Sequence, residues 1–267
     1  MEYFYYQNLL TQDAQLNKGE CSVQRLKVNI AYDGTGFAGF QVQVKKRTIQ
    51  LEIEKALEKI HRQPVRIFAS GRTDSGVHAR SQFIHFDTEL ELSEQNWENA
   101  LRTTFPDDIT VKNVEKVSSD FHARKNARDK TYRYFIRNTS AIDIFMRNFE
   151  WHVPQKLDIQ KMKEAALQIE GTHDFTPFSA SKSNVKGDKT RTVHHIQLFE
   201  EDGRLMVEVK GNGFLTHMVR IIVGTLVDIG LGKKDLDCIE KAFQSKDRRL
   251  LGRTSPGKGL FLWEVTY

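Results

Sequence analysis

One aspartate in a turn-forming stretch is the first candidate for chemistry in this chain. Asp74 lies in "GRTDSGVHAR" (71–80), two residues after Arg72 and two residues before Gly76. Asp, Ser and Gly are typical turn residues, so the hexapeptide taken alone favours a plain turn. If the segment is extended, however, Arg72 and Asp74 project to the same side, where the guanidinium favours an ionised carboxylate. Such a partly buried carboxylate suits a nucleophile better than a proton donor.

A basic stretch with alternating tyrosines is the second candidate. The segment "FHARKNARDKTYRYFIR" (121–137) contains six basic residues and one acid, Asp129. Tyr132 and Tyr134 lie on one face of the expected strand, and Arg133 lies on the other. Two alternating tyrosines are more typical of a packed core face, while the functional alternative is a platform on which RNA bases stack. A second basic run, 181–191, is expected to be a loop, and the two runs together favour a phosphate-backbone partner.

Arg220 is the third candidate, because it stands in the apolar segment "GFLTHMVRIIVGTLVDIG" (213–230). An arginine in an apolar helix needs a partner, since an unpaired buried charge is costly. One interpretation places the guanidinium at the surface, with only its stem in contact with apolar residues. The sharper interpretation pairs Arg220 with a carboxylate such as Asp74.

The sequence predicts neither a metal nor a nucleotide cofactor. Cys21 and Cys238 are far apart and form no ligand pair, and "GTGFAG" (34–39) does not match the glycine pattern of dinucleotide-binding loops. Several histidines show no metal-ligand spacing, and we expect structural roles for them: His78, His122, His173 and His217.

Alternating patterns predict an α+β fold in two related halves. Helices are expected at 47–62, at 93–105 from a Ser93 cap, at 157–171 closed by Gly171, and at 214–230, followed by a shorter one. Strands are expected at 25–34, 65–70, 81–90, 108–117, 130–138 and 259–267, with a hairpin over 191–213 whose tip is Asp202-Gly203. We divide the chain into an N-terminal extension (1–24), an N-terminal half (25–122) and a C-terminal half (123–267).

Composition indicates a globular protein without a membrane anchor. Apolar residues make up 39% of the chain and charged residues 28%, as in ordinary globular domains. The most apolar segment, 213–230, is short for a membrane span and carries three charged or titratable residues, so we expect a buried helix. The first twenty residues lack the features of a signal peptide, and the location expected is the cytoplasm.

Six stretches, in the same order across nearly the whole chain, resemble the tRNA pseudouridine synthases of the TruA type. They are "AYDGTGFAGFQ" with "RTIQ", "GRTDSGVHA", "FHAR" with "KTYRY", "GTHDFTPF", "GNGFLTHMVRIIVGTL" and "SPGKGLFL". The resemblance implies an isomerase that converts uridine to pseudouridine at positions 38, 39 and 40 in the anticodon arm of tRNA. It also implies a homodimer, no cofactor, and two halves related by a pseudo-two-fold that share one continuous mixed, mainly antiparallel sheet with a central RNA-binding cleft.

The resemblance also assigns roles to four residues. Asp74 matches the catalytic aspartate, and Arg72 would contact RNA and help the flipped nucleotide into place. Tyr132 matches the tyrosine that lines the pocket and stacks on the target base, and Arg220 matches the arginine that pairs with the aspartate. Whether Asp74 adds to the ribose C1′ or removes the C2′ proton stays open.

Two other functions remain as alternatives at this point. A non-catalytic RNA-binding module would keep the basic groove and bind RNA with a steep salt dependence, without modifying a base. A metal-dependent nuclease would need two or more carboxylates gathered on a divalent ion, and only Asp74 is convincingly placed for such a role.

Overall fold

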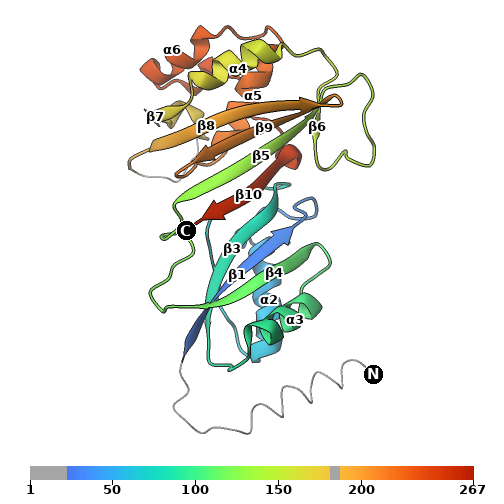
Figure 1. Ribbon diagram of the computed structural model, residues 1–267, viewed down its shortest axis with the longest axis vertical. Coiled ribbons are helices and arrows are strands. Elements are labelled where there is room, and N and C mark those ends of the chain that lie inside the picture. The colour runs from blue at the N-terminus through green and yellow to red at the C-terminus, as the bar shows by residue number, and fades with distance from the viewer. Residues whose placement is uncertain (1–22, 181–186) are drawn as a thin grey trace.

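The computed structural model describes residues 23–180 and 187–267. Most of the expected N-terminal extension (1–24) and residues 181–186 of the second basic run lie outside these ranges. Within them, ten strands form one sheet, and five α-helices flank it (Figure 1). The α+β class is therefore confirmed.

The strands are β1 Gln24–Tyr32, β2 Phe68–Ala69, β3 His78–Thr88, β4 Ile109–Val117, β5 Asp129–Arg137, β6 Trp151–His152, β7 Gly171–Asp174, β8 Thr190–Glu201, β9 Arg204–Gly211 and β10 Leu260–Thr266. The α-helices are α2 Ile49–His61, α3 Glu94–Thr104, α4 Ile159–Leu167, α5 Met218–Gly230 and α6 Asp237–Ser245. Short 3-10 turns occur at Thr176–Phe178, Arg248–Leu250 and Gly257–Gly259.

The strand order is β4-β1-β3-β10-β5-β9-β8-β7, with β2 added to β3 and β6 added to β5. Neighbours are antiparallel, except that β10 runs parallel to β3 and β6 runs parallel to β5. The β3–β10 junction is short: His78 is paired with Phe261, and Ala79 with Leu262. The expected continuous, mainly antiparallel sheet is confirmed, and the stretch 71–80 lies where its two parts join. The boundary between residues 122 and 123 stays a prediction.

Local sequence explains the elements of the N-terminal part. In β1, the side chains of Leu26, Val28 and Ile30 are fully buried while the residues between them are not, which is the period of two of a half-covered strand. The apolar residues of α2 recur at helical spacing and face the sheet. Thr48 caps α2 through its hydroxyl, which accepts from the amide of Leu51, and Ser93 caps α3 as expected.

Four predicted boundaries differ from the structure by three residues or more. The helix α4 ends at Leu167, and Gly171, the expected cap, instead opens β7 with a φ of 106° that favours glycine. The helix α5 begins at Met218 rather than at 214, because His217 takes the left-handed conformation with a φ of 64°. The strand before the Asp74 turn is only the two residues of β2, and β3 begins three residues earlier than expected.

The helix α5 forms the centre of the C-terminal part. Arg220 is the one residue of this helix, all of which is described, that is not buried. A Cβ on Gly224 would lie 1.8 Å from the carbonyl oxygen of Arg253, so the helix packs directly on the backbone of the segment 252–255. In the described ranges, no helix combines the length and the apolar character that a membrane span requires.

Candidate active site

Asp74 stands in a tight turn between β2 and β3. The amide of Val77 donates to the Asp74 carbonyl oxygen at 3.2 Å, and Gly76 has a φ of 73°. Two other segments approach the turn so closely that they need glycine: a Cβ on Gly34 would lie 2.0 Å from the Val77 carbonyl oxygen, and one on Gly257 would lie 2.4 Å from that of Ser75. The turn expected from the sequence is confirmed, and the segments around Gly34 and Gly257 pack tightly against it.

Hydrogen bonds hold the residues before Asp74 to the sheet. The Tyr32 hydroxyl of β1 lies 2.8 Å from the Thr73 hydroxyl, and the side-chain amide of Gln82 of β3 donates to the Gly71 carbonyl oxygen at 2.9 Å. The amide of Phe40 donates to the Thr73 carbonyl oxygen at 3.0 Å. Because these partners come from strands and from the 34–40 loop, the backbone that carries Asp74 is fixed on a rigid support.

The Asp74 carboxylate contacts two cationic or titratable side chains of the C-terminal part. Its Oδ2 lies 3.0 Å from Nη1 of Arg220 and 3.5 Å from Nε2 of His217. The Nε of Arg220 donates to the Ser255 carbonyl oxygen at 2.7 Å, which fixes the guanidinium. The Asp74 side chain is 28% exposed, so it is supported by Arg220 and still accessible from the cleft. The predicted Asp74–Arg220 pair is confirmed.

Both of these partners come from the start of α5. His217 precedes the first residue of the helix and Arg220 lies in its first turn, and the positive end of the helix dipole stabilises a negative charge there. The sequence predicts a structural role for His217, whereas the structure places its imidazole at Asp74. The available signal was its position three residues before Arg220, because a helix running through both residues, as expected for 214–230, would put them on one face. In the structure His217 instead precedes α5 in the left-handed conformation and still reaches Asp74.

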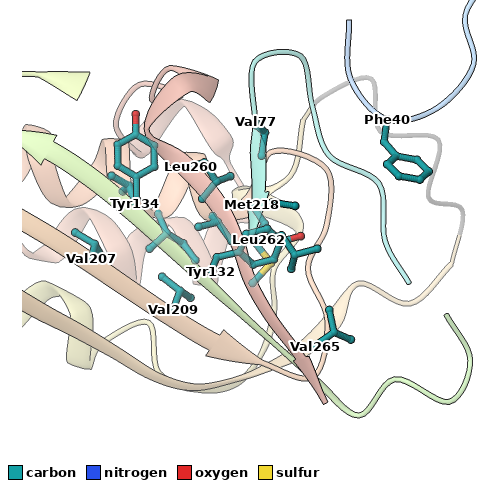
Figure 2. Close-up of a cluster of buried hydrophobic side chains, with 14 of the residues drawn as sticks. Phe40, Val77, Tyr132, Tyr134, Val207, Val209, Met218, Leu260, Leu262 and Val265 are labelled. Carbon is teal, nitrogen blue, oxygen red and sulfur yellow. The ribbon is translucent and has the colours of Figure 1, made fainter. Parts of the chain in front are cut away.

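Tyr132 and Tyr134 lie on the same face of β5 but have different neighbours. Figure 2 shows both rings beside Leu260 and Leu262 of β10. Tyr134 is fully buried and its hydroxyl donates to the Pro256 carbonyl oxygen at 2.8 Å. Tyr132 lines the cleft at Asp74, with its ring edge-to-face against Phe214 at 5.2 Å. The core interpretation therefore holds for both tyrosines, and Tyr132, which is 8% exposed, also lines the cleft, whereas Tyr134 does not.

Burial determines the protonation state of the Tyr132 hydroxyl. It raises the pKa of Tyr132 well above its usual value, and the charge of Asp74 raises it further. The phenol therefore stays protonated at neutral pH and remains able to donate a hydrogen bond. No side chain or backbone group in the described ranges accepts that bond, so the donor is available to a bound molecule.

Cations surround Asp74 in a cleft of about 1170 Å³. Asp74 is the only acidic residue among the described residues that line it, and the lining cations are Lys46, Arg66, Arg72, Arg124, Lys125, Lys130 and Arg220. The structure thus places Arg72, which is exposed, in the same cleft as Asp74. A nuclease with a metal held by several carboxylates does not fit this lining, because Asp74 stands there without a second acid.

The basic run 121–137 is divided between two environments. Arg124, Lys125 and Lys130 line the cleft, while Arg133 and Arg137 form ion pairs elsewhere, with Glu208 at 2.6 Å and Glu150 at 2.8 Å respectively. The alternation of side chains along β5 explains the division, because Lys130 shares the face of Tyr132 and Arg133 does not.

Lys130 is the cation of the cleft that the surrounding protein desolvates most clearly. Its Nζ donates to the Ser70 carbonyl oxygen at 2.8 Å, just before the Asp74 turn. Burial lowers the pKa of Lys130 to about 8, and the charge of Arg124 contributes in the same direction. The ammonium is therefore charged at neutral pH and close to losing its proton.

This geometry suits a reaction on a polyanion. A carboxylate held by a guanidinium and exposed to the cleft can add to an electrophilic carbon or accept a proton from carbon. The cations around it favour a ligand with several phosphates, and the Tyr132 ring offers an aromatic surface at the same point.

Comparisons with known proteins identify the family. A family described as tRNA pseudouridine synthase matches residues 29–124 and 165–267. Proteins named tRNA pseudouridine synthase A are 46% identical in Oceanobacillus iheyensis, over 92% of this chain and 97% of that protein, and 49% identical in Bacillus licheniformis and Listeria innocua, over 91% of this chain and 99% of each relative.

A solved structure titled "Crystal Structure of a Cbf5-Nop10-Gar1 Complex" is 15% identical, with a TM-score of 0.32, over 75% of this chain and 54% of that one. That score is too low to bear on fold or function. The residues matched by the family include the Asp74 turn and the start of α5, which together hold the carboxylate and its partners. The chain belongs to the tRNA pseudouridine synthase family.

Proposed function

We propose that this protein isomerises uridine to pseudouridine at positions 38, 39 and 40 in the anticodon arm of tRNA, with Asp74 as the catalytic carboxylate. The observation that carries this proposal is the Asp74–Arg220 pair at 3.0 Å, in a cleft otherwise lined by cations. The names of the relatives, tRNA pseudouridine synthase A, support the same substrate and reaction.

The reaction rearranges bonds within one nucleotide. The N1–C1′ bond breaks, the uracil ring turns, and C5 becomes bonded to C1′; C5 loses a proton and N1 gains one, so no atom is added or lost overall. Asp74 either adds to C1′ or removes the C2′ proton, since a carboxylate is able to perform either step. Arg220, anchored on the Ser255 carbonyl oxygen, orients the carboxylate and stabilises its negative charge.

The other cleft residues handle the nucleotide. A uridine in a base-paired or stacked arm must leave its stack before Asp74 reaches its ribose. Tyr132 is placed beside Asp74 to contact the extruded base, and its protonated hydroxyl has a hydrogen bond to offer. The exposed Arg72 contacts RNA and helps to hold the nucleotide in the flipped position. As the family resemblance implies, the protein acts as a homodimer in the cytoplasm without a cofactor.

A tritium-release assay tests the reaction and the role of Asp74 together. With unmodified tRNA labelled at C5 of uridine, we expect release by the wild type and a loss on the order of 10⁴-fold or more in Asp74→Asn, because a carboxamide neither adds to C1′ nor accepts the proton. The exposed Asp107→Asn is the matched control and should behave as the wild type.

Binding separates the possible failures of this proposal. Asp74→Asn should still bind tRNA with a steep dependence on salt, because the cations of the cleft are intact. Release at the wild-type rate by Asp74→Asn would show that another group does the chemistry. Salt-sensitive binding without release by the wild type would instead indicate an RNA-binding module.

A further inference from the structure

Phe68 is a large aromatic residue in the wall of the cleft that the proposed reaction does not use. It belongs to β2, and its side chain is 47% exposed although it lies in the same cleft as Asp74. Its ring stacks on the imidazole of His85, with ring centres 5.1 Å apart and planes 19° apart. One face of the ring is therefore covered by His85, and the exposed part of the ring faces the cleft.

His85 gives the Phe68 ring a rigid and uncharged support. It is 2% exposed, and its Nδ1 accepts from the amide of Ala123 at 3.2 Å. Burial lowers the pKa of His85 to about 4, with further contributions from His122 and Arg25. The imidazole is thus neutral at physiological pH. His122, which also lines the cleft, lies against Phe68 with ring centres 5.7 Å apart.

Three cations without acidic partners share this end of the cleft. Arg66 precedes Phe68 by two residues, and Arg124 and Lys125 follow His122. In the part of the chain that the structure describes, none of the three has a carboxylate oxygen within 4.0 Å of its side-chain nitrogens. An exposed ring among unpaired cations is the combination by which proteins hold a single-stranded nucleotide: the base stacks and the phosphates meet the cations.

The cleft has room for more than the target nucleotide. Its volume of about 1170 Å³ is above the roughly 300–1000 Å³ of pockets that enclose one small molecule. Tyr132 and Phe214 supply the aromatic surface next to Asp74. When a uridine is extruded from a strand, its neighbour loses one stacking partner, and an aromatic side chain that replaces this partner offsets part of the cost.

We propose that Phe68 is a stacking platform for an unpaired nucleobase adjacent to the target uridine, with Arg66, Arg124 and Lys125 on the neighbouring phosphates. This rests on the proposed function, because it takes the bound strand to be tRNA. Stacking tolerates any base, so the platform contributes affinity and holds the strand in position without selecting a sequence.

A double-mutant cycle between protein and RNA tests the platform. We expect Phe68→Leu to bind an anticodon-arm RNA about tenfold more weakly than the wild type, because leucine has no ring to stack. Phe68→Leu and the wild type should bind with equal affinity to RNAs in which the nucleotide on one side of the target lacks its base. Phe199→Leu is the matched control: Phe199 is 49% exposed on β8 and does not line the cleft, so its affinity should equal that of the wild type.

Two controls separate a loss of stacking from a damaged fold. They are the variant Phe68→Tyr and the thermal unfolding of each variant. The tyrosine keeps the ring, so its affinity should stay within about twofold of the wild type, whereas a damaged fold would lower the affinity of both variants. An equal loss for Phe68→Leu on intact and on abasic RNA, or no loss relative to Phe199→Leu, would overturn the proposal. Tritium release by the wild type is measured separately, so failure of the reaction and failure of the platform give different results.

Discussion

At the scale of the residue, the site consists of one carboxylate and the groups that hold it and surround it. Arg220 and His217 contact Asp74, and Lys130 contacts the backbone four residues before it. The guanidinium keeps its charge at any pH that a protein tolerates, while Lys130, with a pKa lowered to about 8, loses its charge in the range where tRNA remains intact enough to be studied.

Lys130 therefore predicts a pH dependence of tRNA binding. As the pH rises from about 7 to about 9, across the lowered pKa, the free protein loses the Lys130 charge, so we expect affinity to fall. Lys130→Arg should remove this dependence, because a guanidinium stays charged throughout. The measurement is the dissociation constant for tRNA at constant ionic strength, with the exposed Lys156→Arg as control. The same decline in Lys130→Arg would assign the titration to another group.

The same shift has a defined sign for stability. In the folded chain the pKa of Lys130 is lowered from the ordinary lysine value of 10.5 to about 8. Between about pH 8 and pH 10.5 the unfolded chain therefore binds more protons than the folded chain. The free energy of unfolding from this group alone therefore rises with pH across that window.

At the scale of the element, the helix α5 and the segment 252–255 act as one unit. Arg220 reaches Asp74 while its Nε is bound to the Ser255 carbonyl oxygen, and the amide of Ser255 in turn donates to the Arg220 carbonyl oxygen at 3.0 Å. Gly224, one turn further along, allows this close approach of helix and segment. The orientation of the arginine thus depends on packing outside the cleft.

Gly224→Ala tests this dependence. The added Cβ would meet the Arg253 carbonyl oxygen at 1.8 Å, so the segment must move, and we expect unfolding to become easier by about 1–3 kcal/mol with a clear loss of pseudouridine formation. The control for stability is Gly213→Ala, whose Cβ would lie 3.7 Å from the nearest atoms, on the flexible Arg191 side chain. Urea unfolding compares the two variants, and equal stability would refute the close-packing argument.

At the scale of the whole molecule, the position of the charges matters more than their sum. The net charge of +5 is modest, yet the described residues that line the cleft include seven cations and one acid. Other basic residues are neutralised in ion pairs away from the cleft, as Arg25 is with Asp87 and Arg133 with Glu208. The positive electrostatic potential that attracts a tRNA is therefore concentrated around Asp74.

Salt dependence measures this concentration of charge. Replacing Arg124 and Lys125 together by alanine should reduce the slope of log affinity against log salt concentration by about two, because each of the two cations neutralises one phosphate in the complex. The control is the double replacement of Lys156 and Lys163, which are exposed and do not line the cleft. A slope that falls equally in both variants would mean that tRNA binds without using the cleft.

Much of the local structure and part of the site follow from the sequence by itself. Periods of two and of 3.6 residues indicated the main strands and helices, and Thr-Asp-Ser-Gly indicated the turn, because these patterns depend on neighbours in the chain. Asp202 and Gly203 form the hairpin tip between β8 and β9 as expected. The cost of burying Arg220 alone pointed to a carboxylate partner, and Asp74 is that partner although 146 residues separate the two.

Only the tertiary structure decided which polar and aromatic side chains share the cleft. The spacing of His217 from Arg220 does not by itself name Asp74 as its neighbour, and Phe68 has the pattern of an ordinary strand residue until it is seen on His85 at the cleft wall. The basic run 121–137 is uniform as a sequence, yet β5 turns Lys130 toward the site and Arg133 toward Glu208. The physical reason is that burial, pairing and pKa depend on neighbours that strand pairing brings in from other parts of the chain. The pairing of β2 with β3 places Phe68 on His85, the pairing of β5 with β9 places Arg133 at Glu208, and the β3–β10 junction joins the two parts of the sheet. No local pattern encodes these pairings.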